Sequence, residues 1–185
     1  MVELAALRRG PLDAFAADAD AAAALSVASP RTKLVLRCGS DAIVAAGKAF
    51  GIALPDVCRA ATSEGRAALW LGPDEWLLLA SPNDVETITR QFATEVTTLY
   101  ALIDVSHRSA GIVVEGPRAA ELINCGCALD LRADAFPSGM CTRTLFEKAP
   151  IILWRVNSHT YHVEIERSFA PYVWTMLIEM RGSLP

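Results

Sequence analysis

Four side chains capable of chemistry stand together in the segment Asp104-Val-Ser-His-Arg108: a carboxylate, a hydroxyl, an imidazole and a guanidinium. The first three are the groups of a hydrolase triad, but a triad is assembled from distant segments, and adjacent side chains of an extended segment point to opposite faces. Asp104 and Ser106 would share one face while His107 lies on the other. The segment therefore predicts a strand end at which Asp104 and Ser106 hold the turn into the next strand.

The five cysteines include one close pair, Cys125-Gly-Cys127, that could hold a metal or a redox centre. Its spacing is shorter than that of C-x-x-C motifs, no second pair completes four ligands, and the three histidines lie elsewhere in the sequence. We expect ordinary small core or near-core residues at a helix end, with a redox-sensitive thiol as the alternative. Cys141 precedes a predicted strand and has only Arg143 nearby to lower its pKa, so a structural loop leading into that strand is favoured.

Nucleotide sites and paired-carboxylate sites are not indicated. The sequence contains neither G-x-G-x-x-G nor G-x-x-x-x-G-K-[ST], the glycine-rich motifs that bind dinucleotides and phosphates. Glu164 and Glu166 flank Ile165 in an alternating segment, a pattern typical of the solvent face of a strand. The residues alone therefore predict no catalytic, cofactor-binding or metal-binding residue in this chain.

Aromatic and arginine side chains point to a different kind of function. Trp70, Trp76, Trp154 and Trp174 fall in predicted strands or in the last helix, where core packing is expected. Rigid aromatic side chains in loops, and arginines whose planar guanidinium can meet a partner's carboxylate, are common at subunit contacts. The predicted subunit-interface residues lie in the second half of the sequence: Phe136, Met140, Arg143, Arg167 and Phe169.

The composition is that of a folded globular protein, with 185 residues of which 52% are hydrophobic and 21% charged. A net charge of −4 gives no attraction to nucleic acid or to anionic lipid. The first residues lack the uninterrupted apolar core of an export signal, and no run approaches the ~18 apolar residues of a membrane helix. We therefore expect a cytoplasmic protein with reduced thiols and without nucleic-acid or membrane partners.

The strand and helix patterns divide the chain into an arm and two α+β halves. Residues 1–32 are alanine-rich and sparsely patterned, which predicts an N-terminal arm with at most a short helix around Asp20 to Leu25. Residues 33–105 follow the order β-α-β-β-α-β of ferredoxin-like modules, with Ile52 to Gly65 as a loop.

Residues 109–182 form a second, less perfect copy of this unit. A long irregular connection from Ala128 to Met140 separates its first helix from three strands and a final helix. The predicted fold class is therefore α+β, with two ferredoxin-like halves that share one core.

Several motifs of the chain resemble one known family. They are D-V-S-H-R at 104–108, E-G-P-R-A-A-E-L at 115–122, G-C-A-L-D-L at 126–131, F-P-S-G-M-C-T-R-T at 136–144 and R-S-F-A-P-Y-V-W at 167–174. In this order they resemble the gamma subunit of heterotetrameric sarcosine oxidase. More loosely, they resemble the folate-binding half of aminomethyltransferases, which implies a module of that folate-binding-like fold.

The resemblance implies a non-catalytic structural subunit of a flavoenzyme complex. Such a complex demethylates sarcosine to glycine, passes the carbon to tetrahydrofolate and the electrons to oxygen, and forms hydrogen peroxide. Its alpha, beta and delta subunits are the implied partners. They are implied to carry FAD, FMN, NAD, tetrahydrofolate and zinc, none of which is expected in this chain.

Two alternatives stay open. One is a stand-alone folate-binding or aminomethyltransferase-like protein, in which the D-x-S segment Asp104–Ser106 would lie close to the pterin. That family also uses a carboxylate for the pterin ring and additional C-terminal domains, which this chain does not match. The other is the equivalent subunit of a sister complex that oxidises dimethylglycine or another N-methyl amine, since substrate choice would lie in the flavin subunit.

Overall fold

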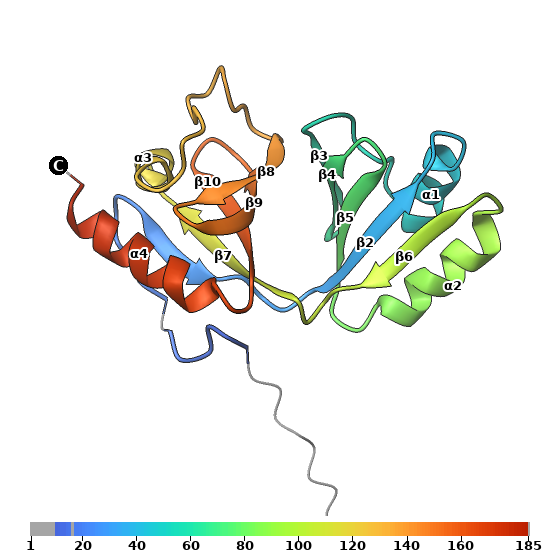
Figure 1. Cartoon of the computed structure of the whole chain (residues 1–185), viewed down its shortest axis with the longest axis horizontal. Helices are drawn as coiled ribbons and strands as arrows, with labels where there is room; N and C mark the ends of the chain where they lie inside the picture. The colour runs from blue at the N-terminus through green and yellow to red at the C-terminus, as the bar shows by residue number, and fades with distance from the viewer. Residues whose placement is uncertain (1–9, 16, 185) are drawn as a thin grey trace, which may run out of the picture.

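The computed structural model describes residues 10–15 and 17–184 and consists of two lobes of similar architecture (Figure 1). Each lobe has a five-stranded antiparallel sheet with two helices on one face, which agrees with the predicted mixture of helices and strands. None of the helices in these residues is long and apolar enough to cross a membrane.

The first lobe follows the predicted order of elements, with one strand added. Its elements are β2 (Thr32–Cys38), α1 (Ile43–Phe50), β3 (Ala60–Ser63), β4 (Arg66–Gly72), β5 (Glu75–Ala80), α2 (Val85–Glu95) and β6 (Tyr100–Asp104). The sheet order is β3-β4-β5-β2-β6. Gly51 ends α1 with a φ of 82°, a left-handed conformation that glycine adopts without strain. The predicted loop from Ile52 to Gly65 contains β3, whose four residues are too few to show a strand pattern.

The second lobe takes one strand from the N-terminal part of the chain. Its elements are β1 (Ala24–Val27), β7 (Ser109–Glu115), α3 (Ala119–Asn124), β8 (Cys141–Phe146), β9 (Ala149–Arg155), β10 (Thr160–Glu166) and α4 (Ala170–Gly182). The sheet order is β1-β7-β10-β9-β8, so β1 pairs with β7 as β6 pairs with β2. The short helix expected around Asp20 to Leu25 is wrong. Pairing with β7 holds this weakly patterned segment as a strand, and Leu25 lies in the core.

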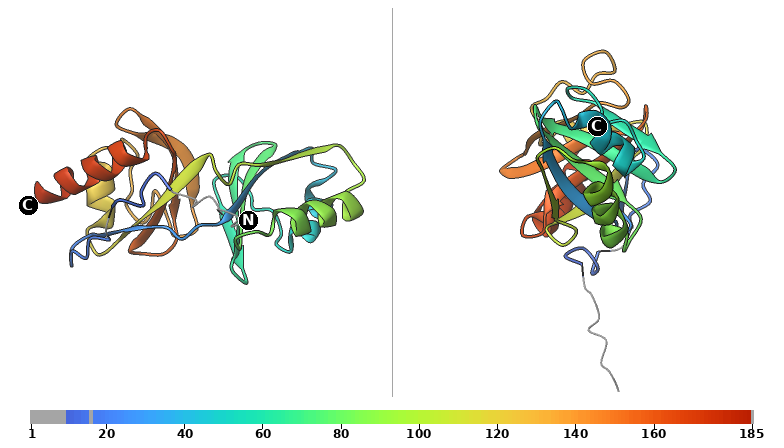
Figure 2. Two further views of the ribbon diagram at one scale, coloured as in Figure 1. Left: turned by 90° about the horizontal axis from the view of Figure 1, so that it is seen from below. Right: turned by 90° about the vertical axis from the view of Figure 1, so that its right-hand side faces the viewer.

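Three hydrophobic clusters hold the layers together. One lies between the first sheet and its helices, a second between the second sheet and its helices, and a third, which includes Leu69 and Leu77, between the two sheets. The helices consequently lie toward the outer ends of the molecule, and the sheets face each other across its middle (Figures 1 and 2). Trp70 is partly buried, and the other predicted core tryptophans are buried: Trp76, Trp154 and Trp174.

Two segments of the chain cross between the lobes side by side (Figure 1). Residues 28–31 connect β1 to β2, and residues 105–108 connect β6 to β7. Val105 donates its N–H to the Lys33 carbonyl oxygen over 2.9 Å, which joins one crossing to the start of β2. The two crossings bring the ends of β2, β7 and β10 to one place.

Candidate functional site at the junction of the two lobes

The two sheets bring side chains of opposite charge together at the lobe junction. In β2, Leu34 points into the core of the first lobe, so alternation turns Lys33 toward the other lobe. In β10, Val163 points into the core of the second lobe, so alternation turns Glu164 toward the first.

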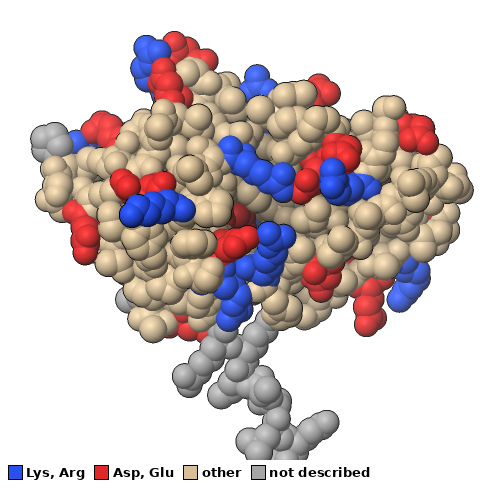
Figure 3. Space-filling model, viewed as in Figure 1, with Lys and Arg blue, Asp and Glu red and all other residues tan. Residues whose placement is uncertain are grey.

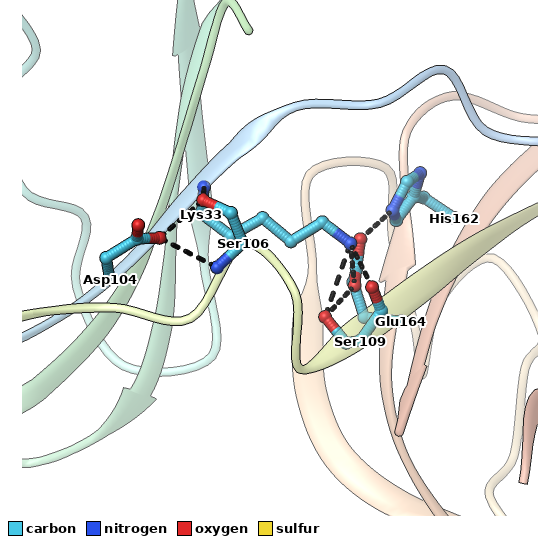
Figure 4. Close-up of polar contacts among 6 residues, drawn as sticks. All are labelled: Lys33, Asp104, Ser106, Ser109, His162 and Glu164. Atoms are coloured by element: carbon cyan, nitrogen blue, oxygen red, sulfur yellow. Dashed lines mark hydrogen bonds and ion pairs between the residues drawn. The ribbon is translucent and has the colours of Figure 1, made fainter. Parts of the chain in front are cut away.

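Lys33 and Glu164 form the centre of a buried polar network (Figure 4). Lys33 Nζ lies 2.7 Å from Glu164 Oε2, and the two side chains are only 7% and 2% exposed. Ser109 donates its hydroxyl to the same oxygen over 2.6 Å, and His162 Nε2 lies 3.0 Å from Glu164 Oε1. The network therefore ties the start of β2 and the start of β7 to the C-terminal part of β10.

The surroundings of Glu164 favour its charged form. Burial by itself raises the pKa of Glu164, but the hydrogen bond and charge of His162 and the charge and hydrogen bond of Lys33 outweigh it and lower the pKa to about 2. A carboxylate with so low a pKa is a weak general base, so it does not activate the Ser109 hydroxyl as a nucleophile. The arrangement suits an ion pair that fixes the two lobes.

Acid should remove the contribution of this carboxylate to stability. The pKa of Glu164 is about 2 in the folded chain against an ordinary value of 4.5, so its stabilisation is complete above about pH 4.5 and is lost as the pH falls through about 2. The difference corresponds to roughly 3 kcal/mol of unfolding free energy. Urea unfolding of the chain over this pH range measures it. The Glu164→Gln variant is the control and should lack this part of the acid dependence; identical pH profiles would contradict the assignment.

The segment around Asp104 lies beside this network and has the structural role predicted for it. β6 ends at Asp104, whose Oδ1 accepts the N–H of Ser106 over 2.9 Å and its hydroxyl over 2.5 Å. Ser106 Oγ in turn accepts the N–H of Lys33 over 3.0 Å. Asp104 and Ser106 therefore hold the turn and tie it to β2, while His107 is exposed at the surface.

A groove of about 310 Å³ opens between the sheets next to the network. Its walls are mostly aliphatic side chains from both sheets, and Glu164 reaches its lining. Figure 3 shows charged side chains gathered in the middle of that view, between the two lobes. Two arginines that line the groove are paired with carboxylates: Arg108 with Glu166, and Arg143 with Glu75.

The cysteines near the predicted motifs lie in structural positions. Cys125 follows α3 at its C-terminal end, as predicted, but its side chain is exposed rather than in the core. Cys127 is buried, with 2% of its surface exposed. Cys141 begins β8 and is buried, and this burial raises the pKa of its thiol to about 12. Such a thiol is protonated near neutral pH and is a poor nucleophile. Among the residues that the structure describes, no cluster of His, Cys, Asp or Glu side chains could hold a metal ion.

The five predicted interface residues do not form one surface. Phe136 was expected in an exposed loop, but it is 2% exposed and lies in the core of the second lobe. The connection that carries it folds inward because the Arg155 guanidinium donates to the Phe136 carbonyl oxygen over 2.8 Å. Met140 and Phe169 are partly buried against the same core. Arg143 is paired with Glu75, and Arg167 is exposed. Their part in a subunit interface stays a prediction.

Sequence patterns did not indicate Lys33, His162 or Glu164 as members of a site. The assignment of Glu164 to a solvent face is wrong, because the face of β10 that carries it is turned to the other lobe, where Lys33 meets it. The sequence nonetheless contains a pattern that could have indicated this buried pair. Each half has an alternating strand with an ionisable residue on the face away from its own helices, and the two residues, Lys33 and Glu164, have opposite charges.

Comparison with known proteins agrees with the sequence motifs. The sequence model of the family described as "Sarcosine oxidase, gamma subunit family" matches residues 38–182. The sarcosine oxidase subunit gamma of Corynebacterium sp. (strain U-96) is 31% identical over 97% of this chain and 92% of its own length. The subunit gamma of Arthrobacter sp is 28% identical over 88% of this chain and 84% of its own length.

Solved structures give the same result. A chain of the heterotetrameric sarcosine oxidase from Corynebacterium sp. U-96 superposes with a TM-score of 0.85 at 29% identity, over 96% of both chains. The aminomethyltransferase T of the glycine cleavage system from Bartonella henselae shares the fold, with a TM-score of 0.66 at 12% identity over 85% of this chain and 46% of that one. The predicted resemblance is confirmed: the chain belongs to the sarcosine oxidase gamma subunit family.

Proposed function

We propose that this chain is the gamma subunit of a heterotetrameric sarcosine oxidase, in which its part is structural rather than catalytic. The observation that carries the proposal is the superposition on a chain of such an enzyme, with a TM-score of 0.85 over 96% of both chains. The identity to two named gamma subunits supports it. The partners are then the alpha, beta and delta subunits of the complex, and the reaction is the oxidative demethylation of sarcosine.

The interior of the chain supports a structural part. A general base or a nucleophile works best with a pKa poised near the working pH. The two strongly shifted groups lie far from that range, since the pKa of Glu164 is about 2 and that of Cys141 is about 12. We assign the chemistry of FAD, FMN, NAD, tetrahydrofolate and zinc to the partner subunits, as the resemblance to the family implies.

A stand-alone folate-binding protein is the less supported alternative. The related family uses a carboxylate for the pterin ring, and Glu164 is the buried carboxylate that lines the groove. Its oxygens are already occupied by Lys33, Ser109 and His162. We regard the two ferredoxin-like halves, 33–105 and 109–182, as a scaffold retained from the folate-binding fold, with β1 as the strand that completes the second half.

Co-expression with the other subunits of a heterotetrameric sarcosine oxidase tests the proposal. We expect a tagged chain to co-purify with the flavin-carrying subunits. Sarcosine-dependent formation of hydrogen peroxide should fall to near background when the chain is omitted, because the remaining subunits lack part of their scaffold. Activity and assembly that are unchanged without the chain would contradict the proposal.

Two added measurements separate the alternatives. A ligand at a hundredfold over its Kd stabilises a protein by about 2.7 kcal/mol, so a clear rise in Tm of the isolated chain with tetrahydrofolate would favour the folate-binding alternative. Dimethylglycine in place of sarcosine tests for the sister complex, which should turn over dimethylglycine faster.

A further inference from the structure

The edges of the two sheets differ in how the chain covers them. At the edge of the second sheet, β1 is covered by Asp18, which exchanges two hydrogen bonds of 2.9 Å with Leu25. The other two edges, β3 and β8, meet near their first residues: Ala60 of β3 donates its N–H to the Gly139 carbonyl oxygen over 2.8 Å, and Cys141 of β8 donates its N–H to the Cys58 carbonyl oxygen over 3.0 Å. Three of the four edges therefore contact another segment of the same chain.

β6, the fourth edge, has no such cover in the part of the chain that the structure describes. Val105 bonds across to Lys33. Hydrogen-bonded pairs alternate along an antiparallel ladder, so the backbone groups of Ile103 also face β2. The N–H and C=O groups of Tyr100 and Leu102 consequently point to the open side of the sheet.

The side chains along β6 add apolar surface to this open edge. Ile103 is 56% exposed, and Leu99, which directly precedes the strand, is 91% exposed. Natural edge strands are usually protected by Lys, Pro, a bulge or an inward-pointing charge. β6 has no charged residue or proline before Asp104, and it pairs with β2 in continuous register. Open backbone groups with apolar flanks form a template for a further strand.

We propose that β6 is a docking edge, on which an extended segment of another subunit of the oxidase pairs as an additional strand of the first sheet. The inference rests on the proposed function, because only a member of a complex has a partner chain to supply that strand. The open groups of Tyr100 and Leu102 select a strand over a helix, since a helix uses its own backbone groups internally. The uncharged row from Leu99 to Ile103 fits apolar side chains on the incoming strand.

Lysine substitutions in and beside β6 test the inference in the co-expressed complex. Leu99→Lys and Ile103→Lys place a charge that opposes edge pairing on side chains that are already largely exposed. We expect each variant to co-purify with the other subunits at about a tenth of the wild-type yield or less, the change that a loss of 1.4 kcal/mol of binding free energy produces. The circular dichroism and Tm of the isolated variants should match the wild type.

Val44→Lys is the matched control. Val44 is an exposed apolar side chain of α1, 84% accessible to solvent, and lies outside β6. The same new charge there should leave co-purification unchanged. If the β6 variants assemble as well as Val44→Lys, the docking edge is refuted.

Hydrogen exchange reports the added strand directly. The amides of Tyr100 and Leu102 should exchange in the isolated chain and become protected about tenfold or more in the assembled complex, because each donates a new backbone bond or is shielded by one. Unchanged exchange at both amides would overturn the proposal. So would a result in which the lysine variants dissociate a homodimer of this chain and leave the heteromeric complex intact. Failure of the wild-type chain itself to co-purify would instead refute the proposed function.

Discussion

The Lys33→Met variant is expected to lose about 3–5 kcal/mol of unfolding free energy, because it leaves the Glu164 carboxylate buried without its cation. In the wild type, Lys33 Nζ lies 2.7 Å from Glu164 Oε2, and both side chains are almost fully buried. Methionine keeps most of the length and apolar volume of lysine, so the loss reports the missing charge more than altered packing. Urea unfolding followed by circular dichroism at neutral pH measures it.

Lys48→Met is the matched control for this substitution. Lys48 pairs with Glu95 over 3.2 Å, and its side chain is 78% exposed, so its removal should cost no more than about 1 kcal/mol. Adding Glu164→Leu to Lys33→Met should recover most of the loss, because an apolar pair leaves no unpaired charge in the interior. Equal losses for Lys33→Met and Lys48→Met would contradict the role of the buried pair.

The buried pair matters for a subunit that acts through its shape. Lys33 belongs to the first lobe and Glu164 to the second, and the third hydrophobic cluster also lies between the two sheets. Apolar contacts are non-directional, whereas the hydrogen bonds that converge on Glu164 are satisfied in one relative position of the lobes. We expect the double Lys33→Met, Glu164→Leu variant to fold and yet assemble less well with the partner subunits if this position is what they recognise.

Much of the first lobe could be predicted because its signals are local. Leu34 and Leu36 lie two residues apart on one face of β2, and Ile43 to Phe50 carry helical spacing that ends at Gly51. Each of these patterns is complete within a short window of sequence, so no knowledge of the other lobe is needed. The turn at Asp104 was predictable for the same reason.

The parts that could not be predicted depend on distant partners. β1 is a strand because β7 offers an edge to it, and β3 because β4 does. A polar residue in an alternating strand is normally taken to face water, and Glu164 could be recognised as buried only by knowing that a second sheet covers it. The loop that carries Phe136 has no period at all, so its inward fold was invisible to pattern analysis.

Phe136→Ala should destabilise the chain by about 3–5 kcal/mol, the loss typical of removing a phenylalanine ring from a packed core. Phe136 is 2% exposed within the second lobe, and the Arg155 guanidinium holds its carbonyl oxygen, so the surrounding loop has little freedom to collapse into the cavity. The midpoint of urea unfolding, followed by circular dichroism, measures the change.

Arg143→Ala separates this core role from an interface role. The Arg143 side chain is 51% exposed and pairs with Glu75, so its removal should cost no more than about 1 kcal/mol of stability. If Arg143 also meets a partner subunit, the folded variant should co-purify poorly, because truncating an interface arginine commonly costs about 2 kcal/mol of binding. Normal co-purification of Arg143→Ala would remove it from the interface. If the Phe136→Ala variant is as stable as the wild type but fails to assemble, the core role is contradicted. Phe136 then belongs to the contact surface, because its ring would be needed for binding a partner and not for folding.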